Sequence, residues 1–402
     1  MKEKGQGKTV LFKTFPDKII FRILLVLILL YGCGCAYLYY QQLFFVEGGL
    51  FESDLPFHVS MAVEDHWFYS FTAFVYLLFY MTPFGNILTA LFLAMISVAT
   101  VFATYELLQQ LTGKKYFPSM MLFFAVMGNF IMPFFLKWAH SQRYIGYQSA
   151  SIWHNSTYAC MRLLGIWTVI YFLRLHEKYR EGLSVKEWLS FAGLLILCNG
   201  VKPSFCLMFA PAMALFLLVE WLVRKVPFKR VFFFGLAVVP SLFVILWQNM
   251  VLFGTDTGNG ILIKPGYALA MRGDHPKVTF VLSIAFPLFV LVFTLNDLIK
   301  DKCYRLIWVM WLFGFLEIFL FTEAGNRAKD SNFFWGYSMA IFFVNLAAMC
   351  KLLEKTKSTE GVFKYPLIRY GFSVGGSLCL AYQVWCGVYF FCQLLTGRSY
   401  WM

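Results

Sequence analysis

The sequence predicts an all-α, polytopic membrane protein, and three observations support this. Hydrophobic residues make up 60% of the 402 residues, charged residues only 14%, and the mean hydropathy is +0.67. A soluble domain is about 45–50% apolar and about 25% charged, so this chain has too few polar side chains to cover a soluble core. Its apolar residues also fall in runs near the roughly 20 residues that cross a bilayer. We expect one membrane domain over residues 1–402.

About eleven runs are predicted as membrane spans: nine for their length and hydropathy, and two shorter ones because the basic clusters on both sides of them are expected to be cytoplasmic. In chain order they are Ile19–Tyr40, Asn86–Leu111, Phe117–Phe135, Thr157–Leu173, Trp188–Cys198, Pro203–Val223, Val231–Phe253, Val278–Leu295, Leu306–Phe321, Phe334–Cys350 and Tyr370–Cys392. The fifth and sixth flank a polar stretch that contains Lys202. One further run, Trp67–Thr82, has the length of a short span but is followed by Pro83 and Gly85.

Basic clusters predict the orientation. The net charge is +13, and most of the 34 lysines and arginines fall in short clusters between apolar runs, which indicates topology signals rather than a nucleic-acid surface. If these clusters are cytoplasmic, residues 1–18 form a cytoplasmic basic tail and the C-terminus is outside. Parity then makes Trp67–Thr82 interfacial or re-entrant. Residues 41–85 become an outer loop with interfacial or re-entrant helices, and residues 86–402 a helical bundle.

This orientation places most of the polar and ionisable residues of the loops on the outer side. Five of the six histidines lie there, and only His176 is cytoplasmic. The first outer loop contains the acidic residues Glu52 and Asp54. Apolar residues at helical spacing predict an amphipathic interfacial helix from Asp54, with Asp54 and His58 on one face. Such a carboxylate can act as a general base or ligate a divalent cation. Alternatively, Asp54 is simply the N-cap of this helix.

The second outer loop carries Arg143, Tyr144 and His154, which suit a phosphate and sugar hydroxyls. An interfacial aromatic belt explains the aromatic residues equally well. Arg162 and Glu317 lie inside predicted spans. Charges there cost roughly 2.5–3.5 kcal/mol on insertion scales, which makes both functional candidates unless they pair with each other or with the backbone.

Later outer segments add further candidates for substrate binding. These are Lys202, Arg272, Glu323 and Arg327. Lys202 could hold a lipid phosphate or only mark an interface. Glu323 and Arg327 belong to a short link whose charge density favours a site over a plain turn.

Several motifs are absent from the sequence. It contains no Walker A motif, no H-E-x-x-H and no G-x-S-x-G, so ATP-driven pumps and zinc proteases are poorly supported. None of the ten cysteines falls in the long polar loops where a disulfide framework would form.

At this point the chain resembles the GT-C-type membrane glycosyltransferases, which use polyprenyl-phosphate-linked sugars. The likeness rests on the order of features over roughly the first 175 residues. A basic start and one span precede an acidic outer loop (FESDLPFH), an aromatic stretch ending in Pro-Phe-Gly, a span, a basic turn (LTGKKYFP) and an outer Arg-Tyr segment (SQRYIGYQSA). Many relatives have an Asp-Glu pair in the acidic loop, whereas this chain has Glu52-Ser53-Asp54.

The resemblance implies transfer of a sugar from a polyprenyl-phosphate donor to a glycan or lipid acceptor at the non-cytoplasmic face. Asp54 would be the base, with Glu52 as substitute or metal ligand. Arg143, Lys202, Arg272 and Arg327 would hold the leaving phosphate. No cofactor is required by this reading, and a divalent cation on Glu52 and Asp54 remains open.

Two other functions stay open at this stage. A flippase or transporter of a lipid-linked or anionic substrate would use Arg162 and Glu317 at its core. A polymerase or ligase of lipid-linked surface glycans would use the outer arginines and histidines. The partners expected are membrane lipid and the donor and acceptor molecules, without nucleic acid. The short tail and compact loops favour a bacterial plasma membrane.

Overall fold

The computed structural model describes residues 15–45, 49–144, 146–151, 153–254, 260–325 and 332–400. Within these ranges the first half of the chain forms α1 (Phe15–Phe44), α2 (Leu55–Val63), α3 (Phe71–Tyr80), α4 (Gly85–Leu111), α5 (Pro118–Asn129), α6 (Ser156–His176), α7 (Val185–Val201) and α8 (Ser204–Leu222). The rest forms α9 (Phe228–Gly235), η1 (Leu236–Val238), α10 (Val239–Phe253), β1 (Ile261–Ile263), α11 (Tyr267–Ala270), α12 (Pro276–Ser283), α13 (Ala285–Thr294), α14 (Asp297–Lys300), α15 (Lys302–Leu320), β2 (Phe321–Glu323), α16 (Phe334–Thr356), η3 (Gly361–Lys364) and α17 (Pro366–Leu395).

The protein is an integral, multi-pass membrane protein built almost entirely of helices. Eight helical segments in the described ranges are long and apolar enough to cross a membrane, and the bent pair α12–α13 would make a ninth. The predicted eleven spans are therefore not confirmed. The difference concerns α5 and α7. The 12 residues of α5 fall short of the about 17–25 that a span needs, and the 17 residues of α7 lie at the lower limit of that range.

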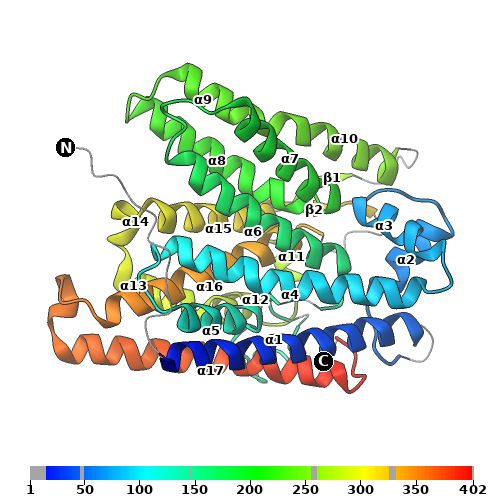
Figure 1. Cartoon of the computed structure of the whole chain (residues 1–402), viewed down its shortest axis with the longest axis horizontal. Coiled ribbons are helices and arrows are strands. Elements are labelled where there is room, and N and C mark those ends of the chain that lie inside the picture. Colours follow the sequence, from blue (N-terminus) through cyan, green and yellow to red (C-terminus); the bar gives the residue numbers. More distant parts are fainter. Residues whose placement is uncertain are drawn as a thin grey trace.

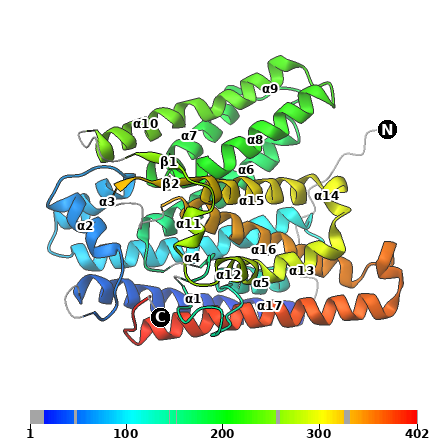
Figure 2. The ribbon, with the colours of Figure 1, turned by 180° about the vertical axis from the view of Figure 1, so that it is seen from behind.

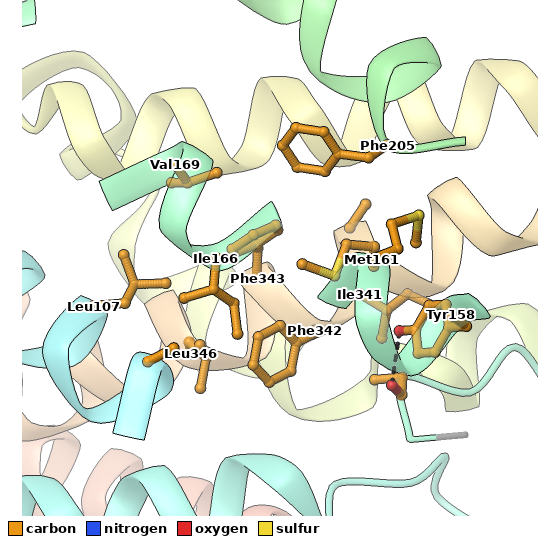
Figure 3. Close-up of a cluster of buried hydrophobic side chains, with 14 of the residues drawn as sticks. Leu107, Tyr158, Met161, Ile166, Val169, Phe205, Ile341, Phe342, Phe343 and Leu346 are labelled. Carbon is orange, nitrogen blue, oxygen red and sulfur yellow. Dashed lines mark hydrogen bonds between the residues drawn. The ribbon is translucent and has the colours of Figure 1, made fainter. Parts of the chain in front are cut away.

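The core of the bundle is α16. Figures 1 and 2 show it between α1 and α17 at one edge and α9 and α10 at the other. The most apolar window of this segment is 94% buried, as expected for a helix that is apolar on every side. Figure 3 shows Phe342 and Phe343 of α16 packed with Leu107 of α4, Ile166 of α6 and Phe205 of α8.

Two of the predicted spans are interrupted, and one buried side chain supports both breaks. After α5 the chain continues without helix, and α12 and α13 meet at an angle of 67°. Gln383 of α17 is fully buried. Its side-chain Nε2 donates to the Met132 carbonyl at 2.8 Å, and its Oε1 accepts from the Phe286 amide at 2.9 Å. Non-helical backbone at membrane depth requires such buried partners.

We expect Gln383→Leu to destabilise the protein by about 2–6 kcal/mol, because it leaves two buried backbone groups without partners at about 1–3 kcal/mol each. Unfolding in mixed micelles titrated with SDS measures the effect. Gln393→Leu on the same helix is the control, since the Gln393 Oε1 has no hydrogen-bond partner among the described residues. Equal stability of the two variants would show that Gln383 does not support the breaks.

The basic clusters lie at one end of the bundle, here called the basic end, where they form ion pairs. Arg174 in the last turn of α6 pairs with Glu106 of α4 at 2.5 Å, and the buried Glu220 of α8 pairs with both Arg180 and Arg224. Asp17 of α1 accepts hydrogen bonds from the first turn of α5 at Ser119. The starts of α1 and α5 therefore lie together, as the parity argument predicted.

The opposite end, here called the Asp54 end, carries α2, α3 and the two short strands (Figures 1 and 2). The strands β1 and β2 pair antiparallel, with Leu262 opposite Thr322. The helix α3 has 10 residues and is about 15 Å long, too short to span a bilayer alone. Its N-cap Ser70 donates to the Val201 carbonyl at 2.8 Å, which ties it to the end of α7.

Candidate functional site

The carboxylate of Asp54 is the centre of a polar cluster at the Asp54 end. Asp54 occupies the N-cap position of α2, with Pro56 in the first turn as predicted, but its side chain makes no capping hydrogen bond. Instead, Oδ2 accepts a hydrogen bond from Asn155 Nδ2 at 2.7 Å. The carboxylate is therefore held toward the loop that precedes α6 rather than toward its own helix.

Asn155 connects this carboxylate to the start of α6. Its Oδ1 accepts from the Tyr158 amide and from the Thr157 hydroxyl, both at 2.8 Å. The residue is therefore the N-cap of α6 and fixes its own amide group so that Nδ2 faces Asp54. The backbone adds a second connection, since the Asp54 amide donates to the His154 carbonyl at 3.0 Å.

Two histidines flank Asp54. His154 Nε2 lies 3.8 Å from Asp54 Oδ2, which is too long for a hydrogen bond. His58, one turn into α2 on the same face, shares a 3.0 Å hydrogen bond with the Ser156 hydroxyl. The His154 ring stacks on Tyr400 with centroids 4.0 Å apart and meets Tyr144 edge to face at 4.7 Å. The C-terminal segment thus closes one side of the cluster.

These contacts fix the charge states. Burial lowers the pKa of both His58 and His154 to about 4, against the opposing effect of the Asp54 charge. Burial alone would raise the pKa of Asp54, but His154, His58, the Asn155 hydrogen bond and Lys202 outweigh it and lower that pKa. At neutral pH the cluster contains an ionised carboxylate between two neutral imidazoles.

The histidines predict an acid-dependent loss of stability. Between pH 6.5 and about 4 the unfolded chain binds protons at His58 and His154 that the folded chain does not, so the free energy of unfolding falls as pH falls through this window. We expect the midpoint temperature of unfolding to be lower at pH 4.5 than at pH 7, and this difference to be smaller in His154→Gln than in the wild type. The exposed His275 serves as control, and His275→Gln should keep the wild-type pH dependence. Identical pH profiles for the two variants would contradict the assignment.

Two cations lie near His154, and one of them, Lys202, also acts on the Asp54 carboxylate. Lys202, the residue that ends α7, donates from Nζ to the Thr157 hydroxyl at 3.0 Å and lies 4.5 Å from the centroid of the Trp335 ring. Arg272 lies over the Phe334 ring at 4.2 Å, and its buried Nε has no acceptor among the described residues. The charge of each opposes protonation of His154. Both therefore act on the same small region.

Two predicted acids are also near this region. Glu52 is exposed and accepts a 2.6 Å hydrogen bond from the Ser399 hydroxyl. Glu323 is buried at the end of β2 and accepts from Asn332 Nδ2 at 3.0 Å. Asn332 in turn accepts from the Trp335 indole at 3.1 Å. Glu52 is thus linked to the surroundings of His154 through the C-terminal segment. Glu323 is linked to those of Lys202 through Asn332 and Trp335 of α16.

Other predicted residues lie elsewhere. Arg143 lies over the Phe135 ring at 3.8 Å and the Tyr389 ring of α17 at 4.6 Å. Arg162 contacts Phe342, and Glu317 has both carboxylate oxygens buried without a hydrogen-bond partner in the described ranges. The two charges have separate sets of neighbours and do not pair. Arg327 lies outside the described residues.

The described residues contain no group of three or more His, Cys, Asp or Glu side chains arranged to hold a metal ion. Carboxylate oxygens that could ligate a metal already accept hydrogen bonds, Asp54 Oδ2 from Asn155 and Glu52 Oε2 from Ser399. The residues present do not form a ready-made divalent-cation site on Glu52 and Asp54, and we derive no step through a metal.

Sequence reasoning did not identify Asn155, Trp335 and Tyr400 as members of this cluster. Asn155 carries a local signal, since it precedes an apolar run as an N-cap does. Trp335 and Tyr400 carry none, because they reach His154 only through the packing of α16 and the chain after α17.

Comparison with known proteins adds no identity. No protein-family model matches the sequence, and no curated protein matches it significantly.

Proposed function

We propose that the chain is a membrane glycosyltransferase that moves a sugar from a polyprenyl-phosphate donor to an acceptor hydroxyl at the non-cytoplasmic face. The observation that carries this proposal is that an ionised carboxylate and two cations from distant segments all lie within electrostatic reach of His154. Asp54 comes from the first outer loop, Lys202 from the end of α7 and Arg272 from beyond α11. The order of features over the first 175 residues, which resembles the GT-C-type enzymes, supports the same class.

The proposed reaction joins the acceptor oxygen to the anomeric carbon of the sugar. The bond from that carbon to the phosphate oxygen breaks, and the bonding electrons leave with the polyprenyl phosphate. The acceptor hydroxyl loses its proton to Asp54, which is ionised and therefore able to accept it. Because the acceptor proton becomes acidic only as the new bond forms, a carboxylate of lowered pKa is basic enough.

The two cations suit the leaving group. A phosphate ester gains negative charge as it departs, and cations fixed in advance near it stabilise that charge in the transition state. Arg272 is suited to this role, since its Nε has no protein acceptor within the described ranges. Lys202 contributes as a point charge beside Trp335, whose ring could stack against a sugar.

Reconstitution tests the proposal. Purified protein in proteoliposomes would receive a panel of radiolabelled hexosyl and pentosyl polyprenyl phosphates together with glycolipid acceptors. We expect protein-dependent release of polyprenyl phosphate and labelled product from at least one donor. If the protein consumes no donor on the panel but carries an intact lipid-linked sugar across the bilayer, the transferase proposal is wrong and the flippase reading replaces it.

A further inference from the structure

A small polar cavity that Asp54 does not line lies between α1, α4 and α6. Its volume is about 20 Å³, and its polar lining comes from Tyr31, Tyr39, Ser97, Thr100, Asn129, Tyr158 and Arg162. On this measure about 10–15 Å³ is enough for one water molecule. The cavity therefore has room for a water molecule or a monatomic ion of similar size.

Arg162 brings a positive charge to this cavity without a matching negative charge. The residue is 7% exposed. Its guanidinium makes only long hydrogen bonds, to the Ala150 carbonyl at 3.4 Å and the Gly128 carbonyl at 3.5 Å, and lies 3.9 Å from the Phe342 ring centroid. Nε has no acceptor, and no carboxylate in the described ranges pairs with Arg162. A guanidinium keeps its charge in proteins, so burial without a counter-charge is strongly unfavourable.

Two of the hydroxyl groups around the cavity, those of Tyr31 and Tyr39, have no strong acceptor for their protons, whereas Ser97, Thr100 and Tyr158 donate theirs to backbone carbonyls. The Tyr31 hydroxyl accepts from the Trp153 indole at 3.1 Å, so its own proton has only the weakly accepting Cys35 thiol as a protein partner. The Ser97 hydroxyl donates to the Leu93 carbonyl at 2.8 Å, which leaves Tyr39 a distant acceptor at 3.4 Å. A cavity that carries the unmatched positive charge of Arg162, with the two tyrosine hydroxyls as further donors, is complementary to an anion.

We propose that this cavity binds one chloride ion, held by Arg162 with the hydroxyls of Tyr31 and Tyr39. The ion supplies the missing counter-charge for α6 and accepts the donors that the protein leaves unmatched. A water molecule would accept some of these hydrogen bonds but would leave the charge of Arg162 uncompensated.

Binding of radioactive chloride to the full chain in nanodiscs tests the proposal directly. We expect saturation at one ion per chain, competition by bromide, and a saturable rise of the unfolding midpoint in sodium chloride over sodium gluconate at equal ionic strength. Arg162→Gln should weaken binding at least about tenfold, as expected for loss of a charge-assisted hydrogen bond. Arg174→Gln, on the same helix but paired with Glu106 at the basic end, should bind as the wild type does.

A second variant covers the case in which Arg162→Gln does not fold. Tyr39→Phe keeps the charge and the ring but removes one donor, and we expect severalfold weaker chloride binding. No saturable binding by the wild type would mean that the cavity holds only water. Unchanged binding in either cavity variant would place the ion elsewhere. Both results would overturn the proposal without bearing on sugar transfer.

Discussion

Replacing Asp54 with asparagine is expected to reduce sugar transfer by about 10²–10⁴-fold, the contribution of a positioned general base. The amide keeps the size of the side chain but cannot take the acceptor proton. The loss should appear in kcat with donor binding largely retained, because Asp54 acts on the acceptor hydroxyl. Transfer rates from a polyprenyl-phosphate sugar in proteoliposomes, normalised to the amount of folded protein, measure it.

Asp65→Asn is the matched control. Asp65 belongs to the same outer loop and is exposed, so this variant should transfer sugar at the wild-type rate while losing the same charge. Full activity in Asp54→Asn would remove Asp54 from the mechanism. Equal losses in the two variants would point to a general effect of charge in this loop.

Replacing Arg272 with glutamine is expected to reduce kcat by about 10²–10³-fold, the effect seen when one preorganised group that stabilises developing charge is lost. Arg272 has an unmatched Nε beside the cluster, and the leaving phosphate is the ligand that would accept its hydrogen bond. Donor affinity should fall less than kcat, since the charge on the phosphate grows in the transition state. Initial rates over a range of donor concentrations separate the two effects.

Lys264→Gln controls for the loss of a cation from the same part of the chain. Lys264 is exposed and lies over the Tyr267 ring at 5.1 Å, so its removal should leave kcat unchanged. An Arg272→Gln variant with normal kcat and only a raised KM would make Arg272 a donor-binding residue rather than one that stabilises the leaving group.

Much of the fold could be predicted from the sequence because membrane spans follow from apolar length and basic clusters. The segments α1, α4 and α15 match predicted spans, and the basic clusters do gather at one end. The breaks could not be predicted. The run Phe117–Phe135 reads as continuous, but α5 ends at Asn129, and the Met132 carbonyl that follows is paired with Gln383, 251 residues further along the chain.

The candidate site was predictable only in part. Asp54, His58 and Lys202 stood out because ionisable side chains are costly near a membrane and need a reason to be there. Their relation to His154 depends on Asn155, which holds two loops together. Arg143 shows the opposite case, since it has the same residue type as Arg272 and an outer-loop position, yet packs between two aromatic rings. Sequence alone does not distinguish these environments.

The central claim is that the Asp54 end of the bundle faces away from the cytoplasm. Phe57 next to the cluster is 64% exposed, and Lys115 is exposed at the basic end. After removal of the native cysteines, Phe57→Cys in intact cells should react with a membrane-impermeant thiol reagent, while Lys115→Cys should react only after the membrane is opened. Labelling in the reverse order would place Asp54 in the cytoplasm and contradict the account.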